Sequence, residues 1–256
     1  MNRMKAFLPN DKILPWFIAL VGMLFVGVLL PINIVPADDA AGRYIPMARA
    51  FAEGNWNYAF HPHSGVLFSS LSGLIHLLPG IGAFRACQLA ALLLWGASLV
   101  PLYHIALHIW HERSVAVICA ILYLLCSHLQ RFVYDGIRDN GRSLGFFLVI
   151  LGILIAFENK DSWRSAVISA SGAAILMMIR VDCVVFGVAG IGFFVILDIK
   201  NHGWHCWRSW TALCLCVMLI APQLYLNYIW SGYPVPNSRY AILCHKMGLP
   251  PLGGQK

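Results

Sequence analysis

The chain of 256 residues is 59% hydrophobic and only 11% charged, and its mean hydropathy is +0.71. Soluble domains are about 45–50% apolar and about 25% charged, so this composition excludes a soluble globular protein and predicts an integral membrane protein. The net charge of +7 comes without a long basic run, which argues against a nucleic-acid partner and favours anionic lipid head groups or a phosphorylated substrate.

The apolar runs predict an all-α, polytopic membrane protein in which residues 1–256 form a single transmembrane domain. Residues 14–35 form an apolar run of 22 residues, close to the ~20 that cross a bilayer and longer than a signal-peptide core. We therefore expect a retained first helix with its basic end in the cytoplasm. In all, about seven spans are expected, with the N-terminus inside and the C-terminus outside. The further spans lie at 85–110, 115–129, 143–157, in two helices within 165–197, and at 211–230.

The first outer loop is expected at residues 36–84 and opens with two adjacent carboxylates, Asp38 and Asp39. Either one can cap a short helix at about 40–53, because negative charge suits a helix N-terminus. The apolar segment 66–78 has 13 residues, which is too few to cross a membrane unaided. The loop therefore predicts short amphipathic helices at the membrane surface, beside the acidic pair.

Charged residues gather at two later points on the same expected side. The second outer loop, 131–142, contains the turn signal Asn140-Gly141. Its charged residues are Arg131, Asp135, Arg138, Asp139 and Arg142. Further along, Arg180 and Asp182 interrupt a long apolar run. We interpret them first as an ion pair that closes a tight turn between two spans, and a binding role for Arg180 is the alternative.

The lysines and arginines do not settle the orientation of the chain. Eight of the 18 fall on the expected cytoplasmic side and ten on the outer side, whereas membrane proteins carry their excess inside. Either the topology is inverted or the outer arginines are held there for function. Seven of the eight outer arginines lie in segments that also carry an acid, which favours the functional interpretation.

An expected cytoplasmic loop at 198–209 contains residues of the types that bind metals. They are His202, His205 and Cys206, and they alternate with three tryptophans. Tryptophan is enriched where a membrane meets water, so this pattern favours an interfacial belt over a metal site.

Four stretches, in this order, carry a family likeness. They are Asp38-Asp39 through Arg43-Tyr44 to Glu53-Gly54, His61-Pro62 leading into 67–78, Arg138-Asp139, and Tyr-Pro-Val-Pro-Asn-Ser-Arg-Tyr at 233–240. Together they resemble the membrane-embedded glycosyltransferases of the C-type fold. That superfamily includes protein O-mannosyltransferases, lipid A aminoarabinose transferases and bacterial arabinofuranosyl- and mannosyltransferases.

The likeness covers residues 14–240 and has three departures. His63 stands where a second proline is common, and the acidic pair lies further from Arg43-Tyr44 than in the aminoarabinose transferases. Family members also continue with several more spans beyond the part that matches this chain. Residues 1–256 are therefore expected to correspond to the N-terminal module of such an enzyme.

The resemblance implies transfer of a sugar from a polyprenyl-phosphate donor to a lipid, glycan or protein acceptor, on the outer side of a bacterial inner membrane. Polyprenyl phosphate is already a good leaving group, so one carboxylate that takes the acceptor's hydroxyl proton suffices for an inverting displacement. The implied catalytic residues are Asp38, Asp39 and Asp139. Of these, Asp38 is expected to be the base and Asp39 a helix cap or metal partner.

The resemblance also implies a set of substrate-binding residues. They are Arg43, Tyr44, His61, Arg138, Arg142 and Arg180. The last three suit a phosphate clamp, because a guanidinium fork matches phosphate oxygens. Some family members need a divalent cation and others do not. Magnesium or manganese on the three aspartates is compatible with this sequence and is not required by it.

Two other functional classes stay open. A transporter places ionisable groups near the middle of its spans, whereas here they gather at one face, which disfavours a transporter. A catalytically incomplete membrane fragment, or one half of a split enzyme, is the stronger alternative, because family members usually continue further.

Overall fold

The computed structural model describes residues 9–32, 35–60, 65–158, 163–203 and 206–231, and every regular element within these ranges is a helix. In chain order the elements are α1 (Pro9–Leu29), η1 (Leu30–Ile32), the π-helical η2 (Ala40–Tyr44), α2 (Ile45–Ala52), α3 (Trp56–Ala59), α4 (Val66–His76), α5 (Ala83–Trp110), α6 (Arg113–Leu125), α7 (Ser127–Tyr134), α8 (Asn140–Glu158), α9 (Trp163–Ile179), η3 (Val181–Cys183), α10 (Val184–His202) and α11 (Trp207–Ser231). The expected all-α fold is confirmed.

Within the described residues, five helices are long and apolar enough to cross a membrane. These stretches are Ile13–Ile32, Ala83–Trp110, Asn140–Glu158, Val184–His202 and Trp207–Leu226. The successive helices α6 and α7 are bent by 50° and would make a sixth span if they cross as one broken helix. The apolar helix α9 has 17 residues, or about 25 Å at about 1.5 Å per residue. The chain thus has the architecture of a multi-pass membrane protein, with a helix at each of the seven expected positions.

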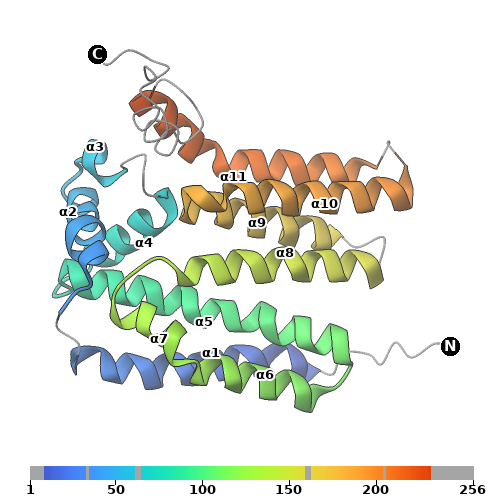
Figure 1. Cartoon of the computed structure of the whole chain (residues 1–256), viewed down its shortest axis with the longest axis horizontal. Helices are drawn as coiled ribbons and strands as arrows, with labels where there is room; N and C mark the ends of the chain where they lie inside the picture. Colours follow the sequence, from blue (N-terminus) through green and yellow to red (C-terminus); the bar gives the residue numbers. More distant parts are fainter. Residues whose placement is uncertain (1–8, 33–34, 61–64, 159–162, 204–205, 232–256) are drawn as a thin grey trace, which may run out of the picture.

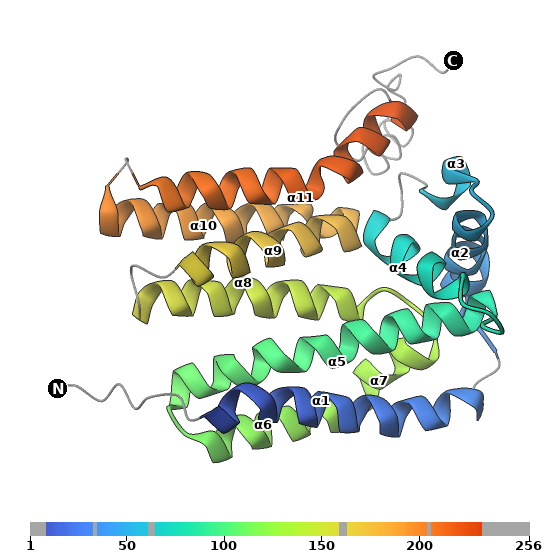
Figure 2. The ribbon, with the colours of Figure 1, turned by 180° about the vertical axis from the view of Figure 1, so that it is seen from behind.

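The long helices run side by side and sort the connecting segments to two ends (Figure 1). Helices α2, α3 and α4 gather at one end, which we call the surface-helix end (Figure 2). The α7–α8 and α9–α10 junctions lie at the same end, and α10 meets α11 at the opposite end. Helix α5 is the central element, since it packs on α1, α4, α6 and α8 and is 72% buried over its spanning stretch.

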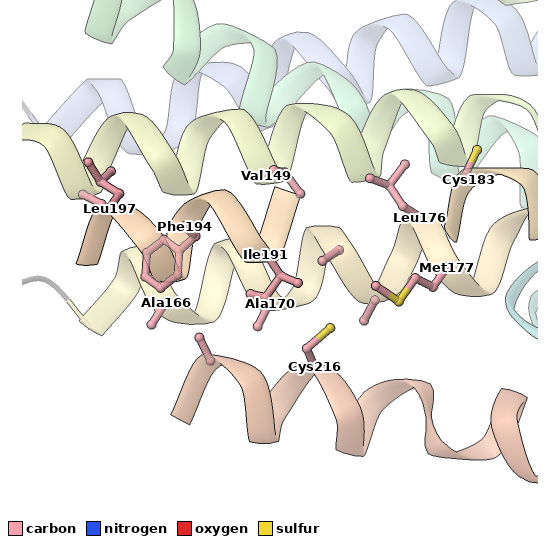
Figure 3. Packing of buried hydrophobic residues seen from close by; sticks show 14 residues of the cluster. Val149, Ala166, Ala170, Leu176, Met177, Cys183, Ile191, Phe194, Leu197 and Cys216 are labelled. Carbon is pink, nitrogen blue, oxygen red and sulfur yellow. The ribbon is translucent and has the colours of Figure 1, made fainter. Parts of the chain in front are cut away.

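Small residues bring α8, α9, α10 and α11 into close contact. The buried positions of α9 include Ala166, Ala170, Ala173 and Ala174, and larger side chains from the neighbouring helices fill the space beside them (Figure 3). A Cβ added at Gly172 would lie 2.7–2.8 Å from backbone atoms of α8. Small residues allow helix backbones to approach in a membrane, where lipid supplies no hydrophobic driving force.

In the expected first outer loop, residues 36–84, the predicted short helices are present, but the predicted helix cap is not formed by Asp39. The short surface helices lie close to the expected places, and Gly54, with a φ of +73°, follows the end of α2. The side chain of Asp39 does not cap this helix, because its backbone is already helical and makes no side-chain cap bond. A capping carboxylate needs a non-helical backbone to reach the free N–H groups. The carboxylate of Asp39 instead lies 3.8 Å from Arg43.

The second outer loop is shorter than predicted. Helix α7 extends to Tyr134 and α8 begins at Asn140, so only residues 135–139 of the expected 131–142 lie between helices. The prediction of a turn at Asn140-Gly141 is wrong, because both residues belong to α8. Gly141 serves close packing instead, because an added Cβ would overlap the side chain of Ile179. The expected loop at 198–209 is also largely helical, since α10 continues to His202.

We expect Gly172→Ala to lower the free energy of unfolding by about 1–3 kcal/mol, because its methyl group would force α8 and α9 apart. The matched control is Gly192→Ala on α10, where an added Cβ meets nothing within 4 Å. That variant should be neutral or slightly more stable, because alanine favours a helix. Unfolding of both proteins in the same detergent measures the difference. Equal stabilities would contradict the close packing of α8 on α9.

Candidate functional site

A cluster of ion pairs lies at the surface-helix end. We call it the Asp139 cluster, and its members are Tyr44, Arg138, Asp139, Arg142, Arg180 and Asp182. Its centre is Oδ1 of Asp139, which accepts a hydrogen bond of 2.7 Å from Arg180 and lies 3.0 Å from a guanidinium nitrogen of Arg142. Arg180 also donates a 2.7 Å hydrogen bond to Asp182. The expected Arg180–Asp182 pair therefore exists, and Arg180 additionally joins two segments 41 residues apart.

Local sequence explains why Asp139 points into this cluster. It directly precedes α8, where a helix N-terminus favours negative charge, and Arg142 follows in the first turn. Gly136, with a φ of +66°, turns the chain between α7 and α8 close to Cys87 of α5. On α5, Gln88 donates a 2.7 Å hydrogen bond to the carbonyl of Tyr134 and so fixes the end of α7.

Arg138 is the least exposed arginine of the cluster. It is 7% exposed, and its guanidinium carbon lies 5.5 Å from the centre of the Tyr44 ring, which is a cation–π contact. Its Nε and Nη1 atoms are buried and have no hydrogen-bond partner in the described part of the chain. Buried donors are rarely left unpaired, so these two groups call for an acceptor that the described residues do not supply.

The charges of the cluster act on one another. Burial alone would raise the pKa of Asp182, yet the hydrogen bond and charge of Arg180 hold it below its ordinary value of 3.8. Burial would lower the pKa of Arg180, whereas Asp182 and Asp139 raise it above its ordinary value. Burial raises the pKa of Tyr44 despite the opposing charge of Arg138. The pairing therefore favours a charged Arg180 and a charged Asp182, and burial favours the neutral phenol of Tyr44.

The acidic pair of the first loop lies at the same end but outside this network. Asp38 and Asp39 are both exposed, and so is Arg43. Asp39 is near enough to Tyr44 for its charge to raise the pKa of that phenol. Asp38 makes no ion pair with any described residue. Of the predicted site residues, His61 lies outside the described residues.

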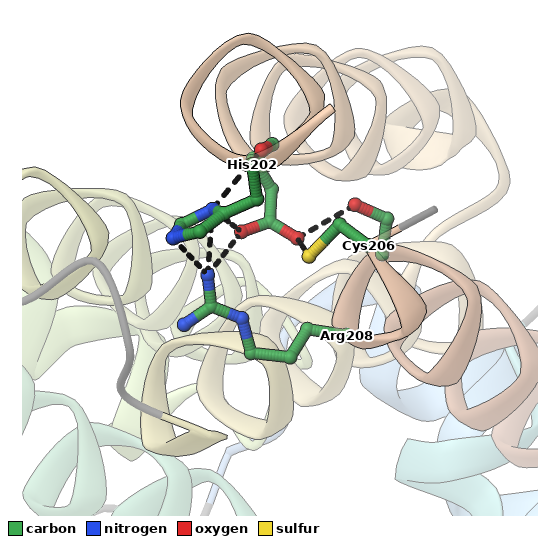
Figure 4. Close-up of polar contacts among 5 residues, drawn as sticks. His202, Cys206 and Arg208 are labelled. Atoms are coloured by element: carbon green, nitrogen blue, oxygen red, sulfur yellow. Dashed lines mark hydrogen bonds and ion pairs between the residues drawn. The ribbon is translucent and has the colours of Figure 1, made fainter. Parts of the chain in front are cut away.

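A second polar cluster lies at the opposite end of the helices, where α10 meets α11 (Figure 4). We call it the Asp198 cluster, and its members are Asp198, His202, Cys206, Arg208 and Ser209. The carboxylate of Asp198 is only 4% exposed and accepts bonds of 2.7 Å from Arg208, 2.7 Å from Ser209 and 2.9 Å from Cys206. The sequence drew attention to His202, His205 and Cys206 but not to Asp198, and His205 lies outside the described residues. The signal for Asp198 was a lone acid at the end of an apolar run, four residues before a histidine.

Only one set of possible metal ligands converges within the described ranges. One ligand atom each from Asp198, His202 and Cys206 lies within 4.8 Å of the other two. Asp38, Asp39 and Asp139 do not form such a set, and Asp139 is already paired with two guanidinium groups. These three aspartates therefore do not fit a preformed magnesium or manganese site.

Fold and sites define the class of protein: an all-α, multi-pass membrane protein with one charged cluster at each end of its helices. Comparison with protein-family models, with curated proteins and with solved structures finds no match to this chain. Its function must therefore be derived from the residues of the two clusters.

We expect Asp182→Asn to lower the melting temperature near neutral pH and to have less effect in acid. A carboxyl whose folded pKa is depressed contributes stability above its unfolded pKa and loses it as the pH falls through the folded value. The gap between wild type and Asp182→Asn should therefore shrink as the pH falls below the ordinary value of 3.8. Asp38→Asn is the matched control on an exposed aspartate. A gap for Asp182→Asn that stays constant with pH would contradict the pairing with Arg180.

Proposed function

We propose that this chain is a membrane glycosyltransferase that moves a sugar from a polyprenyl-phosphate donor to an acceptor hydroxyl. The observation that carries the proposal is the buried guanidinium of Arg138, whose Nε and Nη1 lack hydrogen-bond partners in the described structure. The three arginines and two carboxylates of the Asp139 cluster leave one net positive charge. A phosphate would supply both the missing acceptors and the balancing negative charge.

The donor chemistry matches this arrangement. In the proposed step the acceptor oxygen attacks the anomeric carbon, the bond from that carbon to the phosphate oxygen breaks, and polyprenyl phosphate leaves with the electron pair. Negative charge grows on the phosphate as the bond breaks. Arg138, Arg142 and Arg180 stabilise that charge, and guanidinium groups suit this role because their N–H geometry matches phosphate oxygens.

The acceptor's hydroxyl proton goes to a carboxylate of the first loop, and we assign this role to Asp38. It is exposed and has no ion pair among the described residues, whereas Asp39 lies 3.8 Å from Arg43. Direct attack inverts the configuration at the anomeric carbon. Because Asp139 is held by Arg142 and Arg180, its role is to position the arginines. No step is routed through magnesium or manganese.

Membrane placement completes the proposal. We propose seven spans, in which α9 crosses the membrane and α6 with α7 cross it as one broken helix. With the N-terminus in the cytoplasm, as proposed, the surface-helix end lies outside a bacterial inner membrane. Lipid-linked donors then reach the site from the bilayer. The acceptor is a lipid, a glycan or a protein at that surface. The exposed apolar side chains of α1, α10 and α11 are consistent with lipid contact.

Turnover by the purified chain tests the proposal. The protein, in nanodiscs, is given polyprenyl-phosphate hexoses and pentoses with candidate acceptors, and sugar transfer is followed by mass spectrometry. We expect Asp38→Asn to lower kcat by about 10²–10⁴-fold, the usual contribution of a general base. Arg138→Gln should weaken donor binding. The matched control is Asp135→Asn, which removes an exposed pair with Arg131 and should leave turnover unchanged.

Each outcome separates the alternatives. Full turnover in Asp38→Asn would contradict its assignment as the base, and full turnover in Asp39→Asn as well would exclude the acidic pair from that role. Full turnover in Arg138→Gln would contradict the phosphate site. A wild-type protein that folds but transfers no sugar from any donor would contradict the enzyme and favour a noncatalytic membrane fragment.

A further inference from the structure

We propose that the Asp198 cluster is a binding site for a divalent cation of the zinc type, which ties the end of α10 to the start of α11. This site is independent of the proposed glycosyl transfer. It lies at the opposite end of the helices from the Asp139 cluster, and the 19 residues of α10 separate the two by about 28 Å.

Convergence of the ligand atoms is the first argument. Asp198 and His202 lie one turn apart on α10, and the chain then brings Cys206 back toward them (Figure 4). The sulfur of Cys206 is 2.9 Å from one carboxylate oxygen of Asp198, and Nδ1 of His202 is 3.3 Å from the other. Zinc bonds of about 2.0–2.3 Å place ligand atoms a few ångströms apart, so small side-chain movements suffice to enclose an ion.

The ligand types select the metal. Thiolate and imidazole favour zinc and similar transition metals, whereas magnesium and calcium prefer oxygen ligands. One carboxylate, one imidazole and one thiolate supply three ligands to a four-coordinate ion. Binding converts the Cys206 thiol to a thiolate and releases its proton to solvent. The charge of the site then rises by only one unit.

The surrounding residues support the carboxylate as a ligand. Ser209 and Arg208 each donate a 2.7 Å hydrogen bond to Asp198, one to each oxygen. Such outer contacts orient metal ligands and are part of most metal sites. A carboxylate has about four lone-pair positions, so Asp198 can keep these bonds while the cation takes the place of the Cys206 proton.

Cobalt binding tests this site without any assay of activity. The metal-free protein, residues 1–256, is titrated with Co²⁺ in detergent, and thiolate-to-cobalt charge transfer is recorded in the near ultraviolet. We expect one Co²⁺ per chain with a charge-transfer band that Zn²⁺ removes. Cys206→Ser should abolish the band while its hydroxyl keeps a hydrogen bond to Asp198. The matched control is Cys214→Ser, at an exposed cysteine of α11, which should keep the band.

Two further variants test the cluster by affinity. Ser209→Ala should weaken Co²⁺ binding about 10–100-fold, the usual cost of losing an outer contact. His202→Ala, at an exposed residue, should weaken binding and retain the band. The proposal is overturned if the wild-type protein shows no charge-transfer band, or if the band persists in Cys206→Ser. Cobalt bound without the band would place the ion elsewhere and would also overturn it.

Discussion

The ion pair between Asp139 and Arg180 is the interaction on which the surface-helix end depends. It joins the junction of α7 and α8 to the junction of α9 and α10 through a hydrogen bond of 2.7 Å. Because Arg138 directly precedes Asp139 in the chain, the same bond also helps to hold the guanidinium that lies over the Tyr44 ring. One carboxylate therefore brings together η2, the junction of α7 and α8, and the turn after α9.

The membrane explains why both polar clusters lie at helix ends. A charged side chain within the hydrocarbon costs several kcal/mol, so ionisable groups are placed where helices leave it or are paired there. Between the two ends the helices pack through alanine and glycine, as at Ala170 and Gly172 of α9. Among the described residues, the Asp139 cluster is the proposed anion site and the Asp198 cluster is the proposed cation site.

The sequence predicted the helices well and the contacts between them poorly. The length of an apolar run depends only on neighbouring residues, so the seven helix positions could be predicted directly from the sequence. Gly141 was misinterpreted because a glycine in a tight helix contact and a glycine in a turn look alike without the partner, here Ile179. The bond from Arg180 to Asp139 could not be predicted, since nothing local connects residues 41 positions apart. Asp198 was missed because the two residues that donate 2.7 Å hydrogen bonds to it, Arg208 and Ser209, lie on the following helix.

A double-mutant cycle on lipid-phosphate binding tests whether Asp139 and Arg180 act as one unit. The dissociation constant of a short-chain polyprenyl phosphate is measured in neutral nanodiscs for wild type, Asp139→Asn, Arg180→Gln and the double variant. If the pair holds the anion site together, each single change weakens binding and the double variant binds no worse than either, with a coupling energy of about 0.5–3 kcal/mol. Additive losses, or binding unchanged in the single variants, would contradict that role.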